Sequence, residues 1–183
     1  MRIIGLTGCA RSGKDTVANL IKEYRAGTVL FSFARPMKEF CKMLFGFTHE
    51  QLDGDEREVP DSRWTRPDGT PLTARFALQT LGTEWGRNCD SDLWVKACLN
   101  TMDRSRASIA VVTDVRFLNE AAALRKAGAE LWRVRRAKVN GVGHQSEQFV
   151  WSQGMTEHVT REIDNTGTLN DLRHIVAQAS RPQ

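Results

Sequence analysis

Residues 8–16 read Gly-Cys-Ala-Arg-Ser-Gly-Lys-Asp-Thr, and this stretch decides how the rest of the sequence is interpreted. Gly8 to Lys14 match the pattern GxxxxGK, in which glycines let backbone N–H groups surround phosphate oxygens and the lysine reaches the β- and γ-phosphates. The stretch lies between an apolar run at 2–6 and a helical pattern at 17–24, which is the required strand–loop–helix context. The pattern predicts a phosphate-binding loop. The alternative is an ordinary strand-to-helix turn that happens to contain glycine.

One residue departs from the usual pattern. Asp15 follows Lys14 at the position where a Ser or Thr hydroxyl normally ligates Mg²⁺, and Thr16 comes next. A carboxylate can hold Mg²⁺ directly or through water, because this ion accepts carboxylates and keeps much of its hydration shell. Thr16 is placed to bond the α-phosphate. We expect Asp15 to take part in binding the metal.

Strand-like and helical patterns alternate along the chain. Besides residues 2–6, the strand patterns are at 29–33, 109–113, 131–134 and 162–165. The alternation predicts an α/β fold with a mostly parallel five-stranded sheet and helices on both faces. Further helices are expected at 37–44, 73–81 (ending near Gly82), 92–104, 117–127 and, with Thr168 as its cap, 169–179.

Two stretches lack this alternation. Residues 46–72 are polar, contain three prolines and predict a long irregular segment, of the kind that usually carries function or moves. Residues 136–160 contain Gly141, Gly143 and Gly154 with little periodicity, which predicts a lid-like excursion. We expect one domain over 1–183, with 34–104 as an acceptor-binding region.

Asp114 follows the strand pattern at 109–113, at the edge of the sheet where ligands collect. It is a candidate to bind Mg²⁺ through water, as the second acidic residue of phosphate-loop enzymes does. Capping of the helix at 117–127 is the alternative. Arg116 and Glu120 lie on the same exposed rim, and a structural Arg–Glu pair one turn apart is the alternative to a functional role for them.

The amino-acid composition limits the classes of protein to which this chain can belong. The 183 residues carry 26 Lys and Arg against 22 Asp and Glu, and 19 of the 26 are arginine. Arginine grips phosphate bidentately, although a G+C-rich genome also raises its share. No apolar run is long enough to span a bilayer, and the four cysteines lack CxxC spacing, so neither zinc nor disulfides are suggested. A cytoplasmic protein is expected.

No NKxD sequence of the GTPase kind is present, and a motor would need more motifs and a longer chain. A small kinase fits best. The arrangement of motifs resembles that of the phage-type deoxynucleoside monophosphate kinases, whose loop carries SGKDT. The matching stretches, in chain order, are SFARPMK (32–38), LFG (44–46), LDGD (52–55), ALQTLGTEWGR (77–87), DLWV (92–95), TDVRFLNE (113–120), WRVRR (132–136), HQSE (144–147) and DNTGTLNDL (164–172).

The resemblance implies a P-loop kinase of three-layer α/β/α architecture that transfers the γ-phosphoryl group of ATP to a deoxynucleoside 5′-monophosphate. It implies a possible homodimer and, for a phage-encoded chain, the host cytoplasm. Catalytic roles are expected for Lys14, Arg116 and the closing Arg136. The residues expected at ATP are Gly8, Arg11, Ser12, Gly13, Lys14, Asp15, Thr16 and Asn165. Those expected at the acceptor are Arg35, Lys38, Gln79, Glu84, Trp85, Arg87 and Glu120. Asp15 and Asp114 are expected to serve Mg²⁺.

Several simpler roles stay open. Trp85 offers a flat surface for a base, or it packs with the apolar residues of its helix. Asn165 contacts adenine or belongs to a helix-capping turn. A kinase for another phosphorylated acceptor, such as dephospho-coenzyme A or phosphomevalonate, is the nearest alternative function. A non-catalytic ATP-binding or nucleic-acid-binding protein is the other, but no basic patch with interleaved aromatic residues is present, and no nucleic-acid partner is expected.

Overall fold

The computed structural model describes residues 1–136 and 149–181. The chain forms two compact units, one made of residues 1–33 and 99–183 and the other of residues 34–98. We call them the sheet unit and the inserted unit. Of the residues predicted to form a lid, 136–160, residues 137–148 lie outside the described part, and with them the HQSE stretch, whereas residues 153–158 form a short helix. Along the described residues, no helix is long and apolar enough to cross a bilayer.

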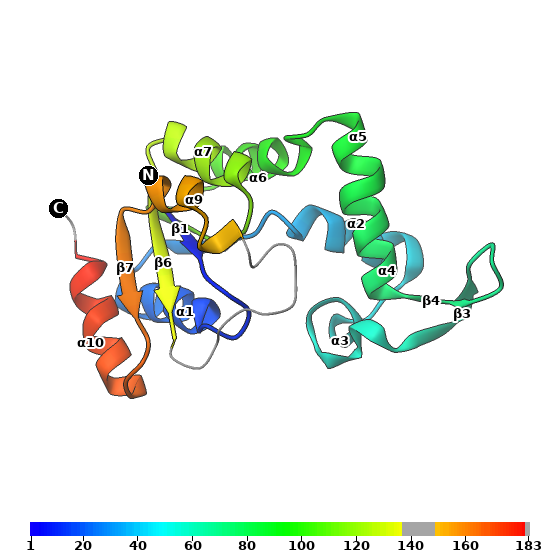
Figure 1. The fold of residues 1–183 in the computed structure, drawn as a ribbon, viewed down its shortest axis with the longest axis horizontal. Coiled ribbons are helices and arrows are strands. Elements are labelled where there is room, and N and C mark those ends of the chain that lie inside the picture. Colours follow the sequence, from blue (N-terminus) through cyan, green and yellow to red (C-terminus); the bar gives the residue numbers. More distant parts are fainter. Residues whose placement is uncertain (137–148, 182–183) are drawn as a thin grey trace. The chain divides into compact units, whose positions relative to one another are not determined.

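The sheet unit contains five parallel strands in the order β2-β5-β1-β6-β7 (Figure 1). The strands are β1 (Arg2–Thr7), β2 (Thr28–Phe31), β5 (Ile109–Val115), β6 (Glu130–Arg135) and β7 (Arg161–Asp164). The chain leaves β1 toward β2 on one side and leaves β5 toward β6 on the other. The carboxyl ends of β1 and β5 therefore form the topological switch point, where open α/β sheets bind ligands.

Helices cover both faces of this sheet, which gives the predicted three-layer α/β/α arrangement. The helices of the sheet unit are α1 (Lys14–Tyr24), α7 (Leu118–Lys126), α9 (Gln153–His158) and α10 (Leu169–Ala179), while α6 (Leu93–Asp103) leads into β5. Thr168 caps α10 as predicted, since its hydroxyl accepts the Asp171 N–H at 3.3 Å. The predicted strands and helices of this unit are confirmed, with ends displaced by a few residues.

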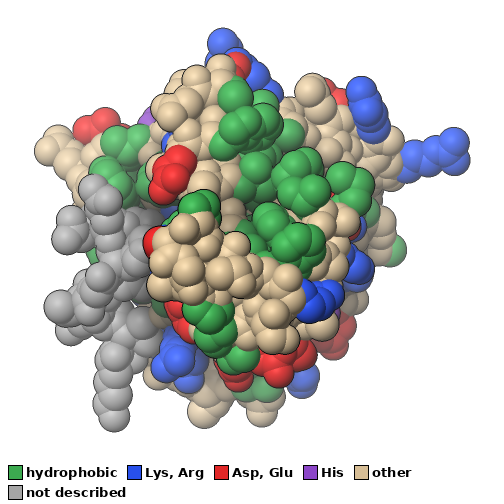
Figure 2. Space-filling view, turned by 90° about the vertical axis from the view of Figure 1, so that its right-hand side faces the viewer, with side chains coloured by type: hydrophobic (Ala, Val, Ile, Leu, Met, Phe, Trp, Pro, Cys, Tyr) green, Lys and Arg blue, Asp and Glu red, His purple; other side chains and the backbone are tan. Residues whose placement is uncertain are grey.

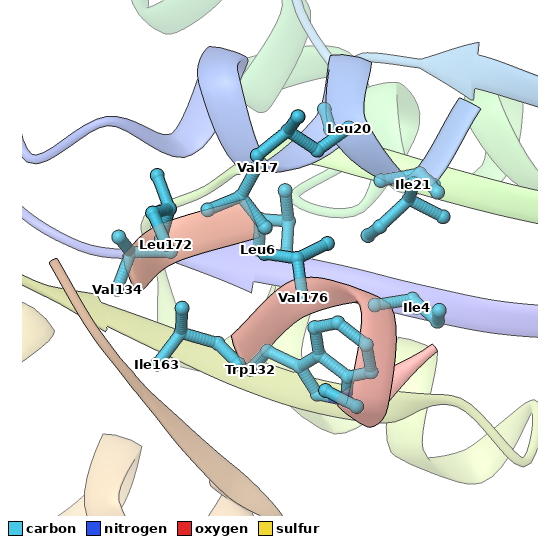
Figure 3. Packing of buried hydrophobic residues seen from close by; sticks show 13 residues of the cluster. Ile4, Leu6, Val17, Leu20, Ile21, Trp132, Val134, Ile163, Leu172 and Val176 are labelled. Atoms are coloured by element: carbon cyan, nitrogen blue, oxygen red, sulfur yellow. The ribbon is translucent and has the colours of Figure 1, made fainter. Parts of the chain in front are cut away.

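The main core lies between the sheet and the helix pair α1 and α10 (Figure 3). Alternation along β1 sends Ile4 and Leu6 to this face. Gly5 faces the other side, where a Cβ would lie 2.9 Å from Leu124 of α7. The fully buried members of the core that Figure 3 labels are Ile4, Leu6, Val17, Ile21, Trp132, Val134, Ile163 and Val176. This packing fixes the end of β1 and the start of α1, which border the predicted phosphate-binding loop.

The inserted unit has its own core. Its elements are α2 (Arg35–Phe45), α3 (His49–Asp53), the 3₁₀ turn η1 (Asp55–Glu58), β3 (Pro60–Thr65), β4 (Pro71–Thr73), α4 (Ala74–Gln79), the π-helical η2 (Thr80–Gly86) and α5 (Arg87–Cys89). Strands β3 and β4 form an antiparallel hairpin (Figure 1). The buried residues at the centre are Cys41, Phe47, Leu52, Leu72, Ala74 and Ala77.

The expectation of a long irregular segment at 46–72 is wrong. Thr48 and Gln51 form a capping box that starts α3, in which the Thr48 hydroxyl accepts the Gln51 N–H at 3.1 Å. Asp68 accepts the Thr70 N–H at 2.9 Å in the turn that joins β3 to β4. Leu52 and Leu72 supply the buried contacts. Local polar caps and two apolar anchors are enough to order this segment.

The helix at 73–81 does not end near Gly82 as predicted, because the chain stays helical to Cys89 through the π-helical η2. A Cβ on Gly82 would lie 2.7 Å from the Met37 sulfur, so this glycine permits close packing rather than ending the helix. The indole of Trp94 donates to the Gly82 carbonyl at 2.9 Å. Short π-helical stretches are frequent at functional sites.

The amphipathic pattern of α2 is only partly buried. Cys41 is 1% exposed, and burial raises the pKa of its thiol to about 11. By contrast Phe40, Met43 and Leu44 are 42%, 76% and 52% exposed. Figure 2 shows that hydrophobic side chains gather at the surface of the molecule. The helix predicted at 37–44 is confirmed, and only part of its apolar face is buried.

A buried carboxylate ties α3 to the hairpin and gives a pH-dependent stability. Asp61 is 5% exposed and accepts hydrogen bonds from the Arg63 guanidinium, from the Arg63 backbone and from Gln51 Nε2. The Arg63 side chain, and then Gln51, hold the pKa of Asp61 well below its ordinary value. Because the pKa of Asp61 is lower in the folded state, its negative charge stabilises the fold at pH values above the unfolded-state pKa of about 4. This stabilisation is lost as the pH falls from about 4 toward the lower folded-state pKa.

We therefore expect Asp61→Asn to lower the thermal midpoint at pH 7 by roughly 5 °C, since it removes the charge that Arg63 and Gln51 satisfy. Thermal melts followed by circular dichroism at pH 7 and pH 3 test this. The difference between wild type and variant should shrink at pH 3. The control is Glu23→Gln, an exposed carboxylate on α1. A gap that is as large at pH 3 as at pH 7 contradicts the assigned role of Asp61.

Candidate active site

The stretch at residues 8–16 forms the turn that connects β1 to α1, as predicted, and its last three residues are the first turn of α1. Gly8 has a φ of +151°, and a Cβ there would lie 2.7 Å from both Ser12 Oγ and the Val134 carbonyl, so the loop can close only around glycine. Lys14 Nζ donates to the carbonyl oxygens of Gly8 and Cys9, each at 2.8 Å. The backbone therefore wraps around the Lys14 side chain.

Polar groups in and beside this loop are suited to a phosphorylated ligand. Among the described residues, the buried hydroxyls of Thr7 and Ser12 have no hydrogen-bond partner. An unsatisfied buried hydroxyl is costly unless a ligand or water completes it. Arg11 has a φ of +60°, which is uncommon outside glycine. Arg11, Asp15 and Thr16 are exposed at the loop and the first turn of α1, where the helix dipole favours an anion.

Asp114 is the second predicted element of the site, and β5 includes it instead of ending before it. Its carboxylate accepts the Ser32 hydroxyl and the Phe33 N–H, both at 2.8 Å. At the start of α7, Phe117 occupies the N-cap position, and Glu120 accepts the backbone N–H groups of Arg116 and Phe117 at 2.8 and 3.0 Å.

Asp15 and Asp114 fit a magnesium ion through the chemistry of their donors. Within residues 1–136 and 149–181, no group of three or more His, Cys, Asp or Glu side chains is placed to hold a metal ion by itself. Magnesium commonly takes only one or two protein carboxylates and completes its shell with water and substrate phosphates. A carboxylate at the start of α1 and another at the end of β5 are consistent with this mode of binding.

Glu120 and the two predicted catalytic arginines occupy different environments. Glu120 is 6% exposed and completes a capping box at the start of α7, so it has a structural role whether or not it meets a substrate. The Glu120 carboxylate accepts the backbone N–H of Arg116, whereas the alternative drawn from the sequence is a pair between the two side chains. The side chains of Arg116 and Arg136 are exposed, and Arg136 is the last residue before the undescribed segment.

The predicted acceptor residues, Glu120 apart, lie in the inserted unit. Arg35 is exposed at the start of α2 and 3.9 Å from the Glu39 carboxylate. Lys38 forms an ion pair with Asp53. Burial acts to raise the pKa of Asp53, but Lys38, with His49 and Arg57, outweighs it and keeps the pKa below its ordinary value. An incoming phosphate would compete with this carboxylate for Lys38.

The remaining acceptor candidates share one helical run. Gln79 ends α4, Glu84 and Trp85 belong to η2, and Arg87 begins α5. Trp85 is 55% exposed, so the alternative that it packs in the core with its neighbours is wrong. Arg87 is half-buried. The π-helical turn carries polar and aromatic side chains side by side, but whether they contact a substrate stays a prediction.

A cluster that sequence reasoning did not assign supports the loop. The Trp151 indole donates to the Cys9 sulfur at 3.2 Å. The guanidinium groups of Arg133 and Arg135 lie 4.7 and 5.8 Å from the Trp151 ring, and both pair with Glu162. Arg133 is 5% exposed. From the sequence one can infer only that Arg133 and Arg135 lie on the same face of β6, because side chains alternate along a strand.

The fold and the loop define the class of P-loop kinases. Two solved structures of similar fold are a dephospho-CoA kinase from Campylobacter jejuni (11% identity, TM-score 0.50, 98% of this chain and 96% of that chain) and TT1252 from Thermus thermophilus (18%, 0.50, 98% and 96%). At these identities the likeness concerns the fold alone.

The chain belongs to the deoxynucleotide monophosphate kinase family, whose model matches residues 64–176. A putative deoxynucleotide monophosphate kinase of Acanthamoeba polyphaga mimivirus is 33% identical over 153 residues, covering 74% of this chain and 75% of that protein. A deoxynucleoside-5′-monophosphate kinase of Escherichia phage T5 is 27% identical over 180 residues, covering 68% and 72%. The resemblance inferred from the motifs is confirmed, and the protein is a nucleoside-phosphate kinase.

Proposed function

We propose that this kinase transfers the γ-phosphoryl group of ATP to a deoxynucleoside 5′-monophosphate and releases ADP and the deoxynucleoside diphosphate. The observation that carries the proposal is the loop closed around Lys14 beside the carboxyl end of β5, in a chain of this family. The two viral relatives are named for action on deoxynucleoside monophosphates, which supports the same acceptor here.

In the proposed reaction, an oxygen of the acceptor phosphate attacks the γ-phosphorus, and the bond from that phosphorus to the β–γ bridging oxygen breaks. Little covalent chemistry is required of the protein, so positioning and positive charge dominate. The loop amides, Gly8, Ser12 and Gly13 among them, hold the β- and γ-phosphates together with Lys14. Arg11 and Thr16 contact the remaining phosphates.

Positive side chains offset the charge on the transferred group. Lys14 acts from the loop, and Arg116 and Arg136 act from the ends of β5 and β6. Magnesium, when bound, shields the phosphates and is held by Asp15 and Asp114, directly or through water. On the acceptor side, Arg35 and Lys38 meet the monophosphate, and Trp85 stacks on the base. The other residues proposed at the acceptor are Gln79, Glu84, Arg87 and Glu120.

The decisive experiment is a substrate panel. The purified protein is incubated with ATP and Mg²⁺ and, separately, with each ribo- and deoxyribonucleoside 5′-monophosphate, dephospho-coenzyme A and phosphomevalonate. Formation of ADP and of the phosphorylated acceptor is measured by chromatography. Turnover with a deoxynucleoside monophosphate supports the proposal. No ADP above background with any monophosphate contradicts it. Gel filtration of the same sample tests the homodimer that the resemblance implies.

Arg87→Ala is expected to raise the KM for the monophosphate about tenfold or more while leaving the KM for ATP near its wild-type value, because a charge-assisted contact to the acceptor is lost. Initial rates at varied concentrations of each substrate measure this. The matched control is Arg75→Ala, which removes a surface ion pair with Glu58 in the same unit. A defect confined to ATP would move Arg87 out of the acceptor site.

A further inference from the structure

Asn165 links the end of β7 to the phosphate-binding loop. Its side-chain Nδ2 donates to the carbonyl oxygen of Ser12 at 2.8 Å, across 153 positions in the sequence. Its own backbone N–H donates to the Arg135 carbonyl at 2.7 Å, which continues the pairing of β6 with β7. The side chain therefore extends from a fixed point on the sheet to the middle of the loop.

Gly13, which follows Ser12, leaves room for the Asn165 side chain because it has no Cβ. A Cβ on Gly13 would lie 2.4 Å from Asn165 Nδ2, closer than two such atoms can approach. Gly13 also has a φ of +98°, which side chains other than hydrogen rarely permit. The motif GxxxxGK explains a glycine at this position only by the close approach of a phosphate to the backbone. The structure adds a second reason, which is the space that Asn165 occupies.

The bond to Ser12 also sets the direction of the next N–H group. In a planar trans peptide, the carbonyl of one residue and the N–H of the next point in opposite directions. Because the Ser12 oxygen points to Asn165, the Gly13 N–H points away from Asn165. A peptide that precedes a glycine rotates easily, since glycine tolerates both signs of φ. The amide of Asn165 resists that rotation.

We propose that Asn165 is a positioning residue that holds the Ser12–Gly13 peptide so that the Gly13 N–H is presented to the triphosphate of the nucleotide. This inference rests on the proposed binding of ATP by the loop. It assigns Asn165 a role different from the adenine contact expected from the sequence. Asn165 acts on the phosphates through the backbone of the loop, so its contribution does not depend on the base.

The test compares binding of ATP with binding of inorganic tripolyphosphate, which has the phosphates and lacks the base. Dissociation constants are measured by calorimetry for wild type, for Asn165→Ala and for Asn165→Leu, which has a similar size and no donor. The expected result is an approximately tenfold loss for both ligands, the effect of one hydrogen bond. Binding of deoxynucleoside monophosphate and the thermal midpoint should stay near wild type. The control is Asn170→Ala, an exposed asparagine on α10.

Each outcome has a distinct meaning. A loss for ATP but not for tripolyphosphate identifies Asn165 as a contact to adenine and overturns the inference. Unchanged binding of both ligands overturns it as well. If Asn165→Ala does not fold, the same comparison with Asn165→Leu decides. A wild-type protein that binds neither ligand contradicts the proposed function itself, so failure of the two proposals can be told apart.

Discussion

Lys14→Ala is expected to lower turnover by about three orders of magnitude, because the lysine supplies the charge nearest the transferred phosphoryl group in the proposed reaction. The fold should survive. Lys14 is half-buried, and its Nζ contacts include two carbonyls of its own loop. Initial rates with saturating ATP and deoxynucleoside monophosphate give the loss of kcat, and circular dichroism gives the thermal midpoint, which we expect to fall by only about 3 °C.

The control for this variant is Lys22→Ala, which removes an exposed lysine from the last turn of the same helix α1. Its turnover and thermal midpoint should match the wild type. If Lys14→Ala keeps wild-type turnover, the loop at 8–16 does not bind the phosphates of ATP, and the assignment of the whole site fails. If both variants lose turnover equally, the effect comes from general loss of positive charge.

Asp114→Asn is expected to lower kcat about a hundredfold at ordinary Mg²⁺ concentrations and to raise the Mg²⁺ concentration needed for half-maximal rate. The substitution is conservative in shape. The amide oxygen can still accept the Phe33 N–H that Asp114 accepts at 2.8 Å, so the end of β5 should keep its structure. What is lost is the negative charge that a divalent cation requires. Rates measured over a range of Mg²⁺ concentrations test this.

Asp164→Asn serves as the comparison, because Asp164 also lies at the carboxyl end of a parallel strand and accepts a backbone N–H, from Thr166 at 3.0 Å. It should leave both kcat and the Mg²⁺ dependence unchanged. An Asp114→Asn variant with wild-type Mg²⁺ dependence would reduce Asp114 to a structural residue that ties the end of β2 to the end of β5.

The parts of the fold that could be predicted are those with a strong local pattern. The run at 2–6 and the motif at 8–16 placed β1, the loop and α1, and Thr168 marked the start of α10 correctly. The error at Gly82 has a physical cause. Glycine ends helices when it takes a positive φ, whereas at Gly82 it makes room for Met37, and one sequence does not distinguish the two uses.

The supporting contacts of the site could not be predicted for a different reason. Trp151 meets Cys9 across 142 positions, and Asn165 meets Ser12 across 153. No local rule connects residues so far apart. The sequence motif identifies the loop that touches the phosphates, but the side chains that hold this loop come from strands and turns whose place is set only by the completed sheet.

The position of β1 within the sheet has a consequence for how the protein is made. β1 pairs on one side with β5 and on the other with β6, so its neighbours begin at residues 109 and 130. A chain that emerges from the ribosome displays the loop at 8–16 early, yet the two strands that flank β1 begin only at residues 109 and 130. Such distant pairings form slowly. The loop at 8–16 is therefore among the first segments translated, whereas the sheet that supports it can be completed only after β5, β6 and β7 have been made.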